Sequence, residues 1–303
     1  MTELTDFQRK ITDLLPNTEL RLWEPMAKHT SFRIGGPVEV MAFPKNTEEL
    51  SELLKVSKIL DCSSVILGAG TNVLAPDAGM RGLVICLKDC MDGMERIDGN
   101  RIRVSSGVTM ARAAVFAAGQ GLSGLEFAHG IPGTVGGGVY MNAGAYGGEI
   151  SQICIAVEVM RADGSTQELP ASEMNFSYRH SRFEDEFGIV VSAVFQLTPM
   201  PETQIREKMQ ELMKRRKTSQ PLELPSAGSA FKRPVGGYAA ALIDESGLKG
   251  YRIGDAAVSE KHAGFVVNLG NATADDVRNL LQSVSDIVFE RTKIRLEPEV
   301  RIW

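Results

Sequence analysis

The chain has 303 residues, of which 43% are hydrophobic and 23% are charged, an ordinary composition for a globular protein. This composition excludes disordered, collagen-like and coiled-coil chains, and the length predicts more than one domain. There are 33 Lys and Arg against 38 Asp and Glu, so the net charge of −5 offers no general basic surface to nucleic acid or an anionic membrane. Any anion-binding site must be local.

The sequence also lacks the patterns of a membrane or secreted protein. No stretch reaches the roughly 20 apolar residues of a membrane helix, and the opening MTELTDFQRK does not resemble a signal peptide. We therefore expect a cytoplasmic protein. The four cysteines and four histidines form no spaced ligand set, and Cys86 with Cys90 is a weak metal signal because structural zinc needs four ligands. No metal and no disulfide framework is expected.

The first half of the chain predicts helices and a buried strand. A short amphipathic helix is expected near the N-terminus. Its apolar face would be formed by Leu4, Phe7, Ile11 and Leu14. A second helix is expected over 46–60, with Asn46 as N-cap, and a third over 108–121, capped by Thr109. Between them, the apolar run 65–67 predicts a buried strand that ends in a glycine turn.

The second half adds antiparallel strands and two long helices. Alternating apolar residues over 153–159 and 189–197 predict two half-buried antiparallel strands. A helix that ends in the basic run 214–217 follows, and another begins at Thr273. The terminal segment 294–302 alternates apolar and charged residues, which predicts a last strand. The fold class is therefore α+β.

Glycine dominates the middle of the chain, with eleven glycines from Gly119 to Gly148. Such density indicates tight turns or a backbone that approaches a ligand closely. The runs LGAGTN, GIPGTVGGG and MNAGAYGGE make three glycine loops that together suit one extended ligand. Alone, LGAGTN is as well explained by an ordinary strand-to-loop turn. A Rossmann motif and a P-loop are disfavoured, because Val73 replaces the third glycine and no Gly-Lys-Ser/Thr occurs.

In this order and spacing the three loops resemble the vanillyl-alcohol-oxidase or PCMH type of FAD-binding fold. From about Thr30 to Trp303 the chain also resembles the MurB family of UDP-N-acetylenolpyruvoylglucosamine reductases, through the further motifs SYRHS, SAGSAFKRP and LEPEVRIW. The resemblance implies a two-lobed FAD-binding unit followed by a C-terminal α+β substrate-binding domain. The expected divisions are 1–88 with the N-terminal helix, 89–199, and 200–303.

The resemblance implies that the loops bind FAD non-covalently, with the pyrophosphate against backbone amides. The implied cofactor-binding residues are Gly68, Ala69, Gly70, Thr71, Asn72, Val73, Gly130, Ile131, Pro132, Gly133, Gly136, Gly137, Asn142, Ala143, Gly144, Ala145, Arg216 and Phe265. Without the family, Phe265 is typical of a core residue and Arg216 of a helix C-terminus. Some relatives of this fold attach FAD to a histidine, but here His129 is expected to be structural.

The family's reaction passes a hydride from NADPH to FAD and then to the β-carbon of an enolpyruvyl ether, in bacterial peptidoglycan precursor synthesis. Negative charge then builds on the substrate as an enolate, which requires a cation or hydrogen-bond donor and a proton source for the α-carbon. The resemblance implies that Ser229 donates this proton, that Arg179 binds the enolate, and that Glu299 polarises the carboxylate or relays protons. Without the family, Ser229 is typical of a serine in a turn, Arg179 of a surface arginine and Glu299 of a residue on a solvated strand face.

The resemblance also implies a site for the UDP-sugar. Its expected residues are Tyr178, Lys217, Lys232 and Arg233. Arg233 stands where some family members have asparagine, and the chain lacks the tyrosine-bearing insertion after Arg179, so it is similar to the shorter of the family's two forms. Arg33 lies in a segment that the family carries, TSFRIGG, but no role follows from this. The expected partners are the UDP-sugar and NADPH, with no nucleic acid, membrane or obligate protein partner.

Two other functions are compatible with these motifs. An FAD-dependent oxidase of the same fold would bind flavin in the same way but return electrons to oxygen, so a covalent flavin or rapid reoxidation in air would identify it. A non-enzymatic nucleotide- or flavin-binding regulator is the second alternative, because a fold alone does not guarantee activity. The presence of Arg179, Ser229 and Glu299 argues against the regulator.

Overall fold

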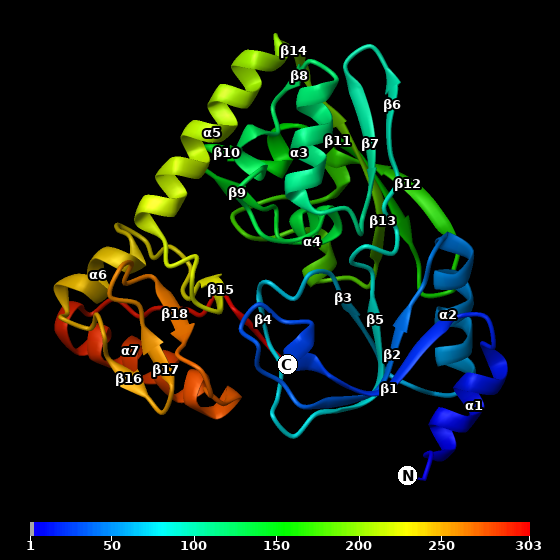
Figure 1. The fold of residues 1–303 in the computed structure, drawn as a ribbon, viewed down its shortest axis with the longest axis horizontal. Helices are drawn as coiled ribbons and strands as arrows, with labels where there is room; N and C mark the ends of the chain where they lie inside the picture. The colour runs from blue at the N-terminus through cyan, green and yellow to red at the C-terminus, as the bar shows by residue number, and fades with distance from the viewer. Residues whose placement is uncertain (1–2) are drawn as a thin grey trace. The chain divides into compact units, whose positions relative to one another are not determined.

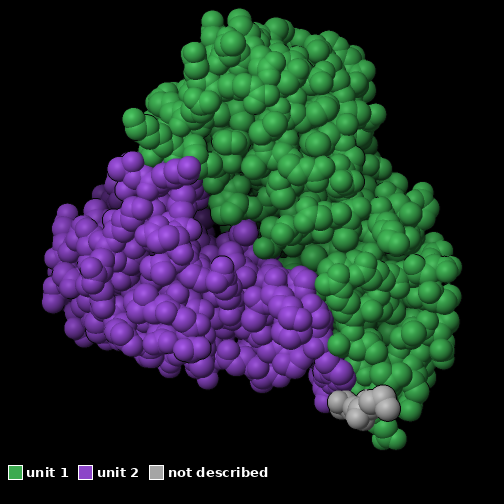
Figure 2. Space-filling view, viewed as in Figure 1, with its two compact units in different colours: residues 1–22, 40–69, 82–215 green, residues 23–39, 70–81, 216–303 purple. Residues whose placement is uncertain are grey.

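The computed structural model describes residues 3–303, which fold into two compact units. Unit 1 holds the described residues up to Leu22, Val40–Ala69 and Gly82–Arg215, and unit 2 holds Trp23–Glu39, Gly70–Arg81 and Arg216–Trp303 (Figure 2). The LGAGTN motif is therefore divided after Ala69, and its second half belongs to unit 2. None of the helices within 3–303 is long and apolar enough to cross a membrane.

A four-stranded sheet organises the first part of the chain (Figure 1). Its strands, in spatial order, are β1 (Glu19–Pro25), β2 (Pro37–Phe43), β5 (Met80–Cys86) and β3 (Ser64–Leu67), with β3 parallel to β5. Helix α1 (Asp6–Leu14) precedes β1 along the chain, and helix α2 (Thr47–Ile59) follows β2. Apolar residues of α1, α2 and this sheet share one core cluster.

The expected helix over 46–60 and the expected strand over 65–67 are confirmed as α2 and β3. Asn46 caps α2 by accepting a hydrogen bond from the Glu49 amide at 2.8 Å. The N-terminal helix also forms, but its expected apolar face is partly wrong. Ile11 is fully buried, whereas Leu4 and Leu14 are 44% and 49% exposed. The helix ends at Leu14, so the chain turns there and places Leu15 in the core instead.

The largest sheet of unit 1 has five antiparallel strands, drawn mostly in green in Figure 1. Their spatial order is β12 (Thr166–Pro170), β11 (Cys154–Met160), β13 (Ile189–Gln196), β7 (Arg101–Ser105) and β6 (Met94–Asp98). Helix α4 (Val135–Tyr140) contacts β13, and α3 (Met110–Gly119), capped by Thr109 as expected, packs near α4.

The two expected antiparallel strands are confirmed as β11 and β13, with two corrections. β13 is not half-buried, because it is the central strand and all of its residues except Gln196 are buried. In β11 a register shift between Cys154 and Ala156 breaks the simple alternation. Cys154 is buried and Ile155 is exposed as a result.

Short elements complete unit 1. They are the strand pairs β8 (Leu122–Ser123) with β14 (Thr198–Pro199) and β9 (Gly144–Ala145) with β10 (Gly148–Glu149), and the 3-10 turns Glu126–Ala128, Ile150–Gln152, Ala171–Glu173 and Arg182–Glu184. A further 3-10 turn, Met26–Lys28, lies in unit 2. Helix α5 (Glu202–Ser219) contains the last residues of unit 1 and the first of the C-terminal segment of unit 2.

Unit 2 is built on a four-stranded antiparallel sheet and two helices. The spatial order is β15 (Ser226–Ser229), β18 (Phe265–Asn268), β17 (Ala256–Val258) and β16 (Arg252–Ile253). Helix α7 (Ala274–Thr292) contacts β16 and β17, and α6 (Ala239–Glu245) contacts α7 (Figure 1). Apolar residues from β15, α6, α7 and the segment around Phe32 form its core.

The expected terminal strand over 294–302 is mostly wrong. Only β19 (Arg301–Ile302) is a strand, and it pairs in parallel with β4 (Val73–Leu74). Upstream, Pro298 makes a single bridge to Phe231, because proline cannot donate to a strand ladder. Leu296 and Val300 are buried as the alternation predicts, but Ile302 is 42% exposed.

A substitution at the start of α7 tests how much this helix depends on its cap. The Thr273 hydroxyl accepts a hydrogen bond from the Asp276 amide, and the Asp276 carboxylate accepts one from the Thr273 amide, each at 3.0 Å. Thr273→Ala removes one of these bonds and is expected to lower the free energy of unfolding by about 1 kcal/mol in urea denaturation. Asn279→Ala, at an exposed position in the same helix, should cause no loss.

Candidate functional site

In unit 1 the glycine loops that the sequence singled out lie against one another. A Cβ built on Gly68 would lie 2.7 Å from the Thr134 hydroxyl, so the loop after β3 contacts the loop before α4. Thr134 caps α4 by accepting a hydrogen bond from the Gly137 amide at 3.3 Å. The third loop leaves the end of α4, where the Ala143 amide donates to the Gly138 carbonyl at 2.8 Å. The first loop therefore meets the two later loops, which follow each other closely in the sequence, at one place.

The glycines are required first by the protein's own packing. A Cβ on Gly70, which has φ +60°, would lie 2.0 Å from the His29 carbonyl oxygen. On Gly136 it would lie 2.8 Å from the Cβ of Ser106, and on Gly144 2.7 Å from the Gly148 carbonyl oxygen. Close approach of backbone to backbone thus explains these glycines, where the sequence alone suggested a ligand.

The loops fit a phosphate-bearing dinucleotide such as FAD. They consist of small residues whose backbones are half-exposed, among them Gly68, Ala69, Gly130 and Gly133. The only acidic residue in the three loops is Glu149, at the end of the third, so residues 67–73, 130–138 and 141–148 contain no carboxylate that would repel a pyrophosphate. The amides of Gly136 and Gly137 are already used, since they donate to the Ser106 carbonyl and the Thr134 hydroxyl. Backbone amides elsewhere in the loops would have to bind the phosphates.

The expected catalytic arginine is at the tip of a tight turn in unit 1. Ser177 and His180 exchange two backbone hydrogen bonds of 3.2 Å, which closes the turn around Tyr178 and Arg179. Arg179 has φ +55°, a strained conformation for this residue type that is common at functional sites. Its Nη2 donates to the Gly144 carbonyl at 2.9 Å, and its guanidinium lies 5.0 Å from the Tyr178 ring centre.

Further hydrogen bonds join this turn to the third glycine loop and to the end of α4, which precedes that loop. The buried Asn142 side chain donates to the Ser177 carbonyl at 3.0 Å and accepts from the Ser151 amide at 2.9 Å. The buried Ser181 hydroxyl donates to the Tyr140 carbonyl at 2.7 Å. The structure thus brings the Arg179 turn and the Asn142–Ala145 loop into one hydrogen-bonded cluster. Ser181 was missed by sequence reasoning, although it lies in the SYRHS motif.

In unit 2 the other two expected catalytic residues lie on neighbouring segments. Ser229 ends β15 and is exposed, and Gly228 before it has φ +78° with open space around it. Glu299 is half-buried, and its amide donates to the carbonyl of Ala230, the residue after Ser229, at 2.9 Å. The Asn72 side chain donates to the Glu299 carbonyl at 3.1 Å. The Gly70–Val73 half of the first loop is therefore attached to the Glu299 segment.

Two expected cofactor-binding residues of unit 2 are buried. Phe265 pairs with Ser229 across the sheet, and its ring packs edge-on against His262 with centres 5.0 Å apart. Arg216 is 8% exposed and follows Ile205, Met209 and Leu212 at helical spacing on α5. It thus occupies a position on the buried face of the helix where the pattern would place an apolar residue.

The expected substrate-binding cations of unit 2 are more exposed. Lys217 is exposed near the end of α5, and its carbonyl accepts from the Lys261 ammonium at 2.8 Å. The Lys232 ammonium lies 3.4 Å from a Glu297 carboxylate oxygen. The Arg233 guanidinium lies 4.4 Å from the Tyr238 ring centre, and Tyr238 is 62% exposed. Tyr178 in unit 1 is also exposed, at 48%.

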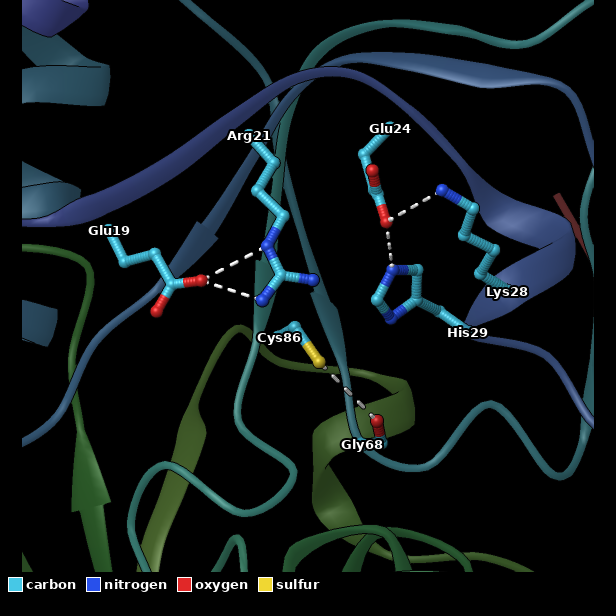
Figure 3. A network of polar contacts seen from close by, with 7 residues as sticks. All are labelled: Glu19, Arg21, Glu24, Lys28, His29, Gly68 and Cys86. Carbon is cyan, nitrogen blue, oxygen red and sulfur yellow. Dashed lines mark hydrogen bonds and ion pairs between the residues drawn. The ribbon is translucent and has the colours of Figure 1, made fainter.

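Figure 3 shows polar contacts around the first loop and the segment that packs on it. In unit 1, Glu19 and Arg21 form an ion pair at 2.6 Å, and the Cys86 thiol lies 3.9 Å from the Gly68 carbonyl oxygen. In unit 2, the His29 ring and the Lys28 ammonium lie 2.9 and 3.8 Å from the same Glu24 oxygen. Of these residues, Cys86 contacts Gly68 and His29 lies against Gly70.

The cysteines have the chemistry of buried thiols. Burial raises the pKa of Cys86, raises that of Cys90 to about 11 and raises that of Cys154 to about 12. All three thiols are therefore protonated near neutral pH, whereas metal binding requires thiolates. Within residues 3–303 no group of three or more His, Cys, Asp or Glu is placed to hold a metal ion.

The half-buried His262 ring predicts a loss of stability at acid pH. Burial lowers its pKa, and Nδ1 accepts a hydrogen bond from the Gly264 amide at 3.1 Å, which requires that nitrogen to be unprotonated. In the unfolded chain the ring takes up a proton as the pH falls through about 6.5, so this stabilisation is lost below that pH. Between pH 7.5 and pH 5.5, the free energy of unfolding measured in urea should decrease less for His262→Gln than for the wild type. Equal decreases would contradict the assignment.

Comparison with known proteins agrees with this arrangement. Residues 220–303 match the family model described as UDP-N-acetylenolpyruvoylglucosamine reductase, C-terminal domain, and residues 38–170 match that of an FAD binding domain. UDP-N-acetylenolpyruvoylglucosamine reductases of Agathobacter rectalis and Lactococcus lactis subsp. cremoris are each 45% identical. The first alignment covers 98% of both chains, and the second covers 97% of this chain and 98% of the relative.

A solved structure of the same enzyme has the same fold. The UDP-N-acetylenolpyruvylglucosamine reductase (MurB) of Thermus caldophilus is 36% identical, with a TM-score of 0.80 over 95% of this chain and 99% of that chain. The expected PCMH-type FAD-binding fold with a C-terminal MurB domain is confirmed. The chain therefore belongs to the UDP-N-acetylenolpyruvoylglucosamine reductase family and is an FAD-binding oxidoreductase with that activity.

Proposed function

We propose that the protein uses NADPH to reduce UDP-N-acetylglucosamine enolpyruvate to UDP-N-acetylmuramate, as a cytoplasmic step of peptidoglycan precursor synthesis. One observation carries the residue assignment: hydrogen bonds join the Arg179 and Glu299 segments each to an expected cofactor loop, and the Ser229 segment to the Glu299 segment. Arg179 donates to Gly144, and the Asn72 amide group holds the Glu299 carbonyl. Ser229 lies one residue from Ala230, which accepts from the Glu299 amide.

Hydride transfer between the nicotinamide and the substrate is the chemistry that bound FAD would supply. We propose that the backbones of 68–73, 130–137 and 142–145 hold it, as the absence of acidic residues and the small side chains there support. Arg216, which continues the buried face of α5, and the buried Phe265 are proposed as further contacts.

Arg179 is proposed to bind the enolate oxygen that develops on the substrate. Its charge is permanent, and its planar group has several donors, so one N–H can hold the Gly144 carbonyl while others remain for a ligand. The left-handed backbone at Arg179 and the bonds that hold the turn fix the guanidinium in place before substrate arrives. Such preorganised charge is the usual basis of enolate stabilisation.

Ser229 is proposed to donate a proton to the substrate α-carbon. An alcohol is a weak acid, but it suffices for a strongly basic enolate carbon, and the exposed end of β15 presents the hydroxyl. Glu299 is proposed to polarise the substrate carboxylate or to relay the proton. Lys217, Lys232, Arg233 and Tyr178 are proposed to bind the UDP-sugar, since each reaches the surface of its unit or lies partly exposed.

An anaerobic absorbance experiment tests the proposal. The flavin bands of the purified holoenzyme should bleach when NADPH is added and recover when UDP-N-acetylglucosamine enolpyruvate follows. If the reduced flavin does not react with the enolpyruvyl sugar but is reoxidised rapidly in air, the result would favour the oxidase of the same fold. NADH replacing NADPH at equal rate would contradict the choice of donor.

A further inference from the structure

The segment Thr30–Ile34 of unit 2 is firmly anchored and has no part in the mechanism above. Phe32 and Ile34 are 1% and 2% exposed and belong to the core of unit 2. The buried Asn268 amide group of β18 donates to the Phe32 carbonyl at 2.9 Å, and the Thr30 hydroxyl donates to the Ile34 carbonyl at 2.9 Å. The backbone between these anchors is therefore fixed relative to β18.

Ser31, inside this segment, makes three hydrogen bonds that reach two different functional segments. The longest runs from its hydroxyl to the Gly70 carbonyl at 3.4 Å. Its amide donates to the Gly70 carbonyl at 3.0 Å, in the second half of the first glycine loop. Its hydroxyl donates to the Ser226 carbonyl at 2.6 Å, at the start of the strand that ends in Ser229. Both partners lie in the same unit as Ser31. Ser31 thus joins the cofactor loop to the strand that carries the proposed proton donor.

Strand β15 needs such an attachment more than a regular strand would. It is the edge strand of its sheet, with β18 on one side. Its pairing shifts between Ser226 and Ser229, and Gly228 has φ +78° with no atom within 4 Å of a built Cβ. On its β18 side the strand is held by the pairing of Ser226 with Val267 and of Ser229 with Phe265. The bond from Ser31 to the Ser226 carbonyl is a further attachment, made by a segment outside the sheet.

We propose that Ser31 is a positioning residue, which holds Ser229 in register with the cofactor loop through the Ser226 carbonyl. This inference rests on the proposed role of Ser229. Ser31→Ala deletes the hydroxyl, and with it the 2.6 Å bond to Ser226 and the 3.4 Å bond to Gly70. It keeps the amide, whose 3.0 Å bond is the shorter of the two to the Gly70 carbonyl. The variant should therefore retain its cofactor and lose the alignment of the proton donor.

The expected result is a split between the two half-reactions. In Ser31→Ala the dissociation constant for FAD, measured by quenching of flavin fluorescence on the apoprotein, and the rate of flavin reduction by NADPH should stay within about twofold, since the Ser31 amide still donates to the Gly70 carbonyl. Reoxidation by the enolpyruvyl sugar should slow by about 10- to 100-fold, the size expected of a displacement near 1 Å. Ser31→Thr restores a hydroxyl and should recover most of the rate.

Ser51→Ala is the matched control. The Ser51 hydroxyl also donates to a distant carbonyl, that of Gly164, at 2.9 Å, but it joins α2 to the turn after β11 in unit 1. This variant should show wild-type rates in both half-reactions. An Ser31→Ala enzyme that loses both half-reactions equally, or that reoxidises at the wild-type rate, would overturn the proposal.

Amide hydrogen exchange of the holoenzyme tests the attachment without any turnover. The peptide covering 226–231 should exchange faster in Ser31→Ala than in Ser51→Ala, and unchanged exchange would overturn the attachment itself. If the flavin of the wild type is not reoxidised by the enolpyruvyl sugar, the proposed function is refuted instead. The hydrogen-exchange measurement does not depend on that function.

Discussion

Ser229→Ala is expected to slow formation of the reduced sugar by about 10²- to 10⁴-fold, the usual contribution of a positioned proton donor. Reduction of the flavin by NADPH should proceed at nearly the wild-type rate, because that step transfers no proton to the substrate carbon. Rapid-mixing absorbance of the flavin, with each half-reaction started separately, measures both rates. The substitution should not unfold the protein, since Ser229 is exposed at the end of β15.

Two observations would distinguish this role from a general disturbance. Ser283→Ala, on α7 of the same unit, removes a serine hydroxyl away from the proposed site and should react at the wild-type rate in both steps. The Ser229→Ala enzyme should also bind FAD as tightly as the wild type. Normal turnover of Ser229→Ala would remove Ser229 from the mechanism, and equal slowing of both half-reactions would assign it to flavin binding.

The helices were the most predictable part of the fold, because their signals are local. Asn46, Thr109 and Thr273 each accept a hydrogen bond from the amide three residues later, as the sequence predicts for an N-cap. In α5, Ile205, Met209 and Leu212 recur at helical spacing in the sequence, and all three are buried. Only the ends were misjudged, as at Leu14, where burial depends on the direction the chain takes after the helix.

Strands were less predictable, because their burial depends on neighbours that are distant in sequence. The alternation in 189–197 suggests one buried face, but β13 lies between β11 and β7 and is covered on both faces. In 294–302 the same alternation is present, yet Pro298 leaves a single bridge and only Arg301 and Ile302 find a partner strand, β4. No local pattern specifies that partner.

The motifs predict which residues form the candidate site, but they do not indicate how those residues are attached to one another. They predict Gly144, Arg179, Asn72 and Glu299 as members of the site. The bonds that join them end on main-chain carbonyls, as from Arg179 to Gly144 and from Asn72 to Glu299. Every residue has the same main-chain carbonyl, whatever its side chain. The sequence therefore carries no signature of such an acceptor. Ser31 and Ser181 were overlooked for this reason.

Arg179→Lys is expected to slow reoxidation of the flavin by the enolpyruvyl sugar by about 10²-fold, and Arg179→Met by about 10³-fold, the range measured when one donor to a developing oxyanion is removed. Lysine keeps the charge but not the planar fork, so it cannot hold the Gly144 carbonyl and an enolate oxygen in the same geometry. Neither replacement is β-branched, so both accept the φ of +55° about as well as arginine does. Rapid-mixing measurement of the two half-reactions should find the defect in the second.

Arg182→Lys separates the role of Arg179 in charge stabilisation from its role in structure. Arg182 follows in the same segment and also donates to a main-chain carbonyl, that of Glu173, at 3.1 Å, while pairing with Glu186 at 2.7 Å. If loss of an arginine-to-carbonyl bond were the whole effect, both lysine variants would lose stability and rate to a similar extent. We expect similar, small losses of stability, near 1 kcal/mol in urea unfolding, but a slow second half-reaction in Arg179→Lys alone. Equal rates in the two variants would mean that Arg179 only holds the loop.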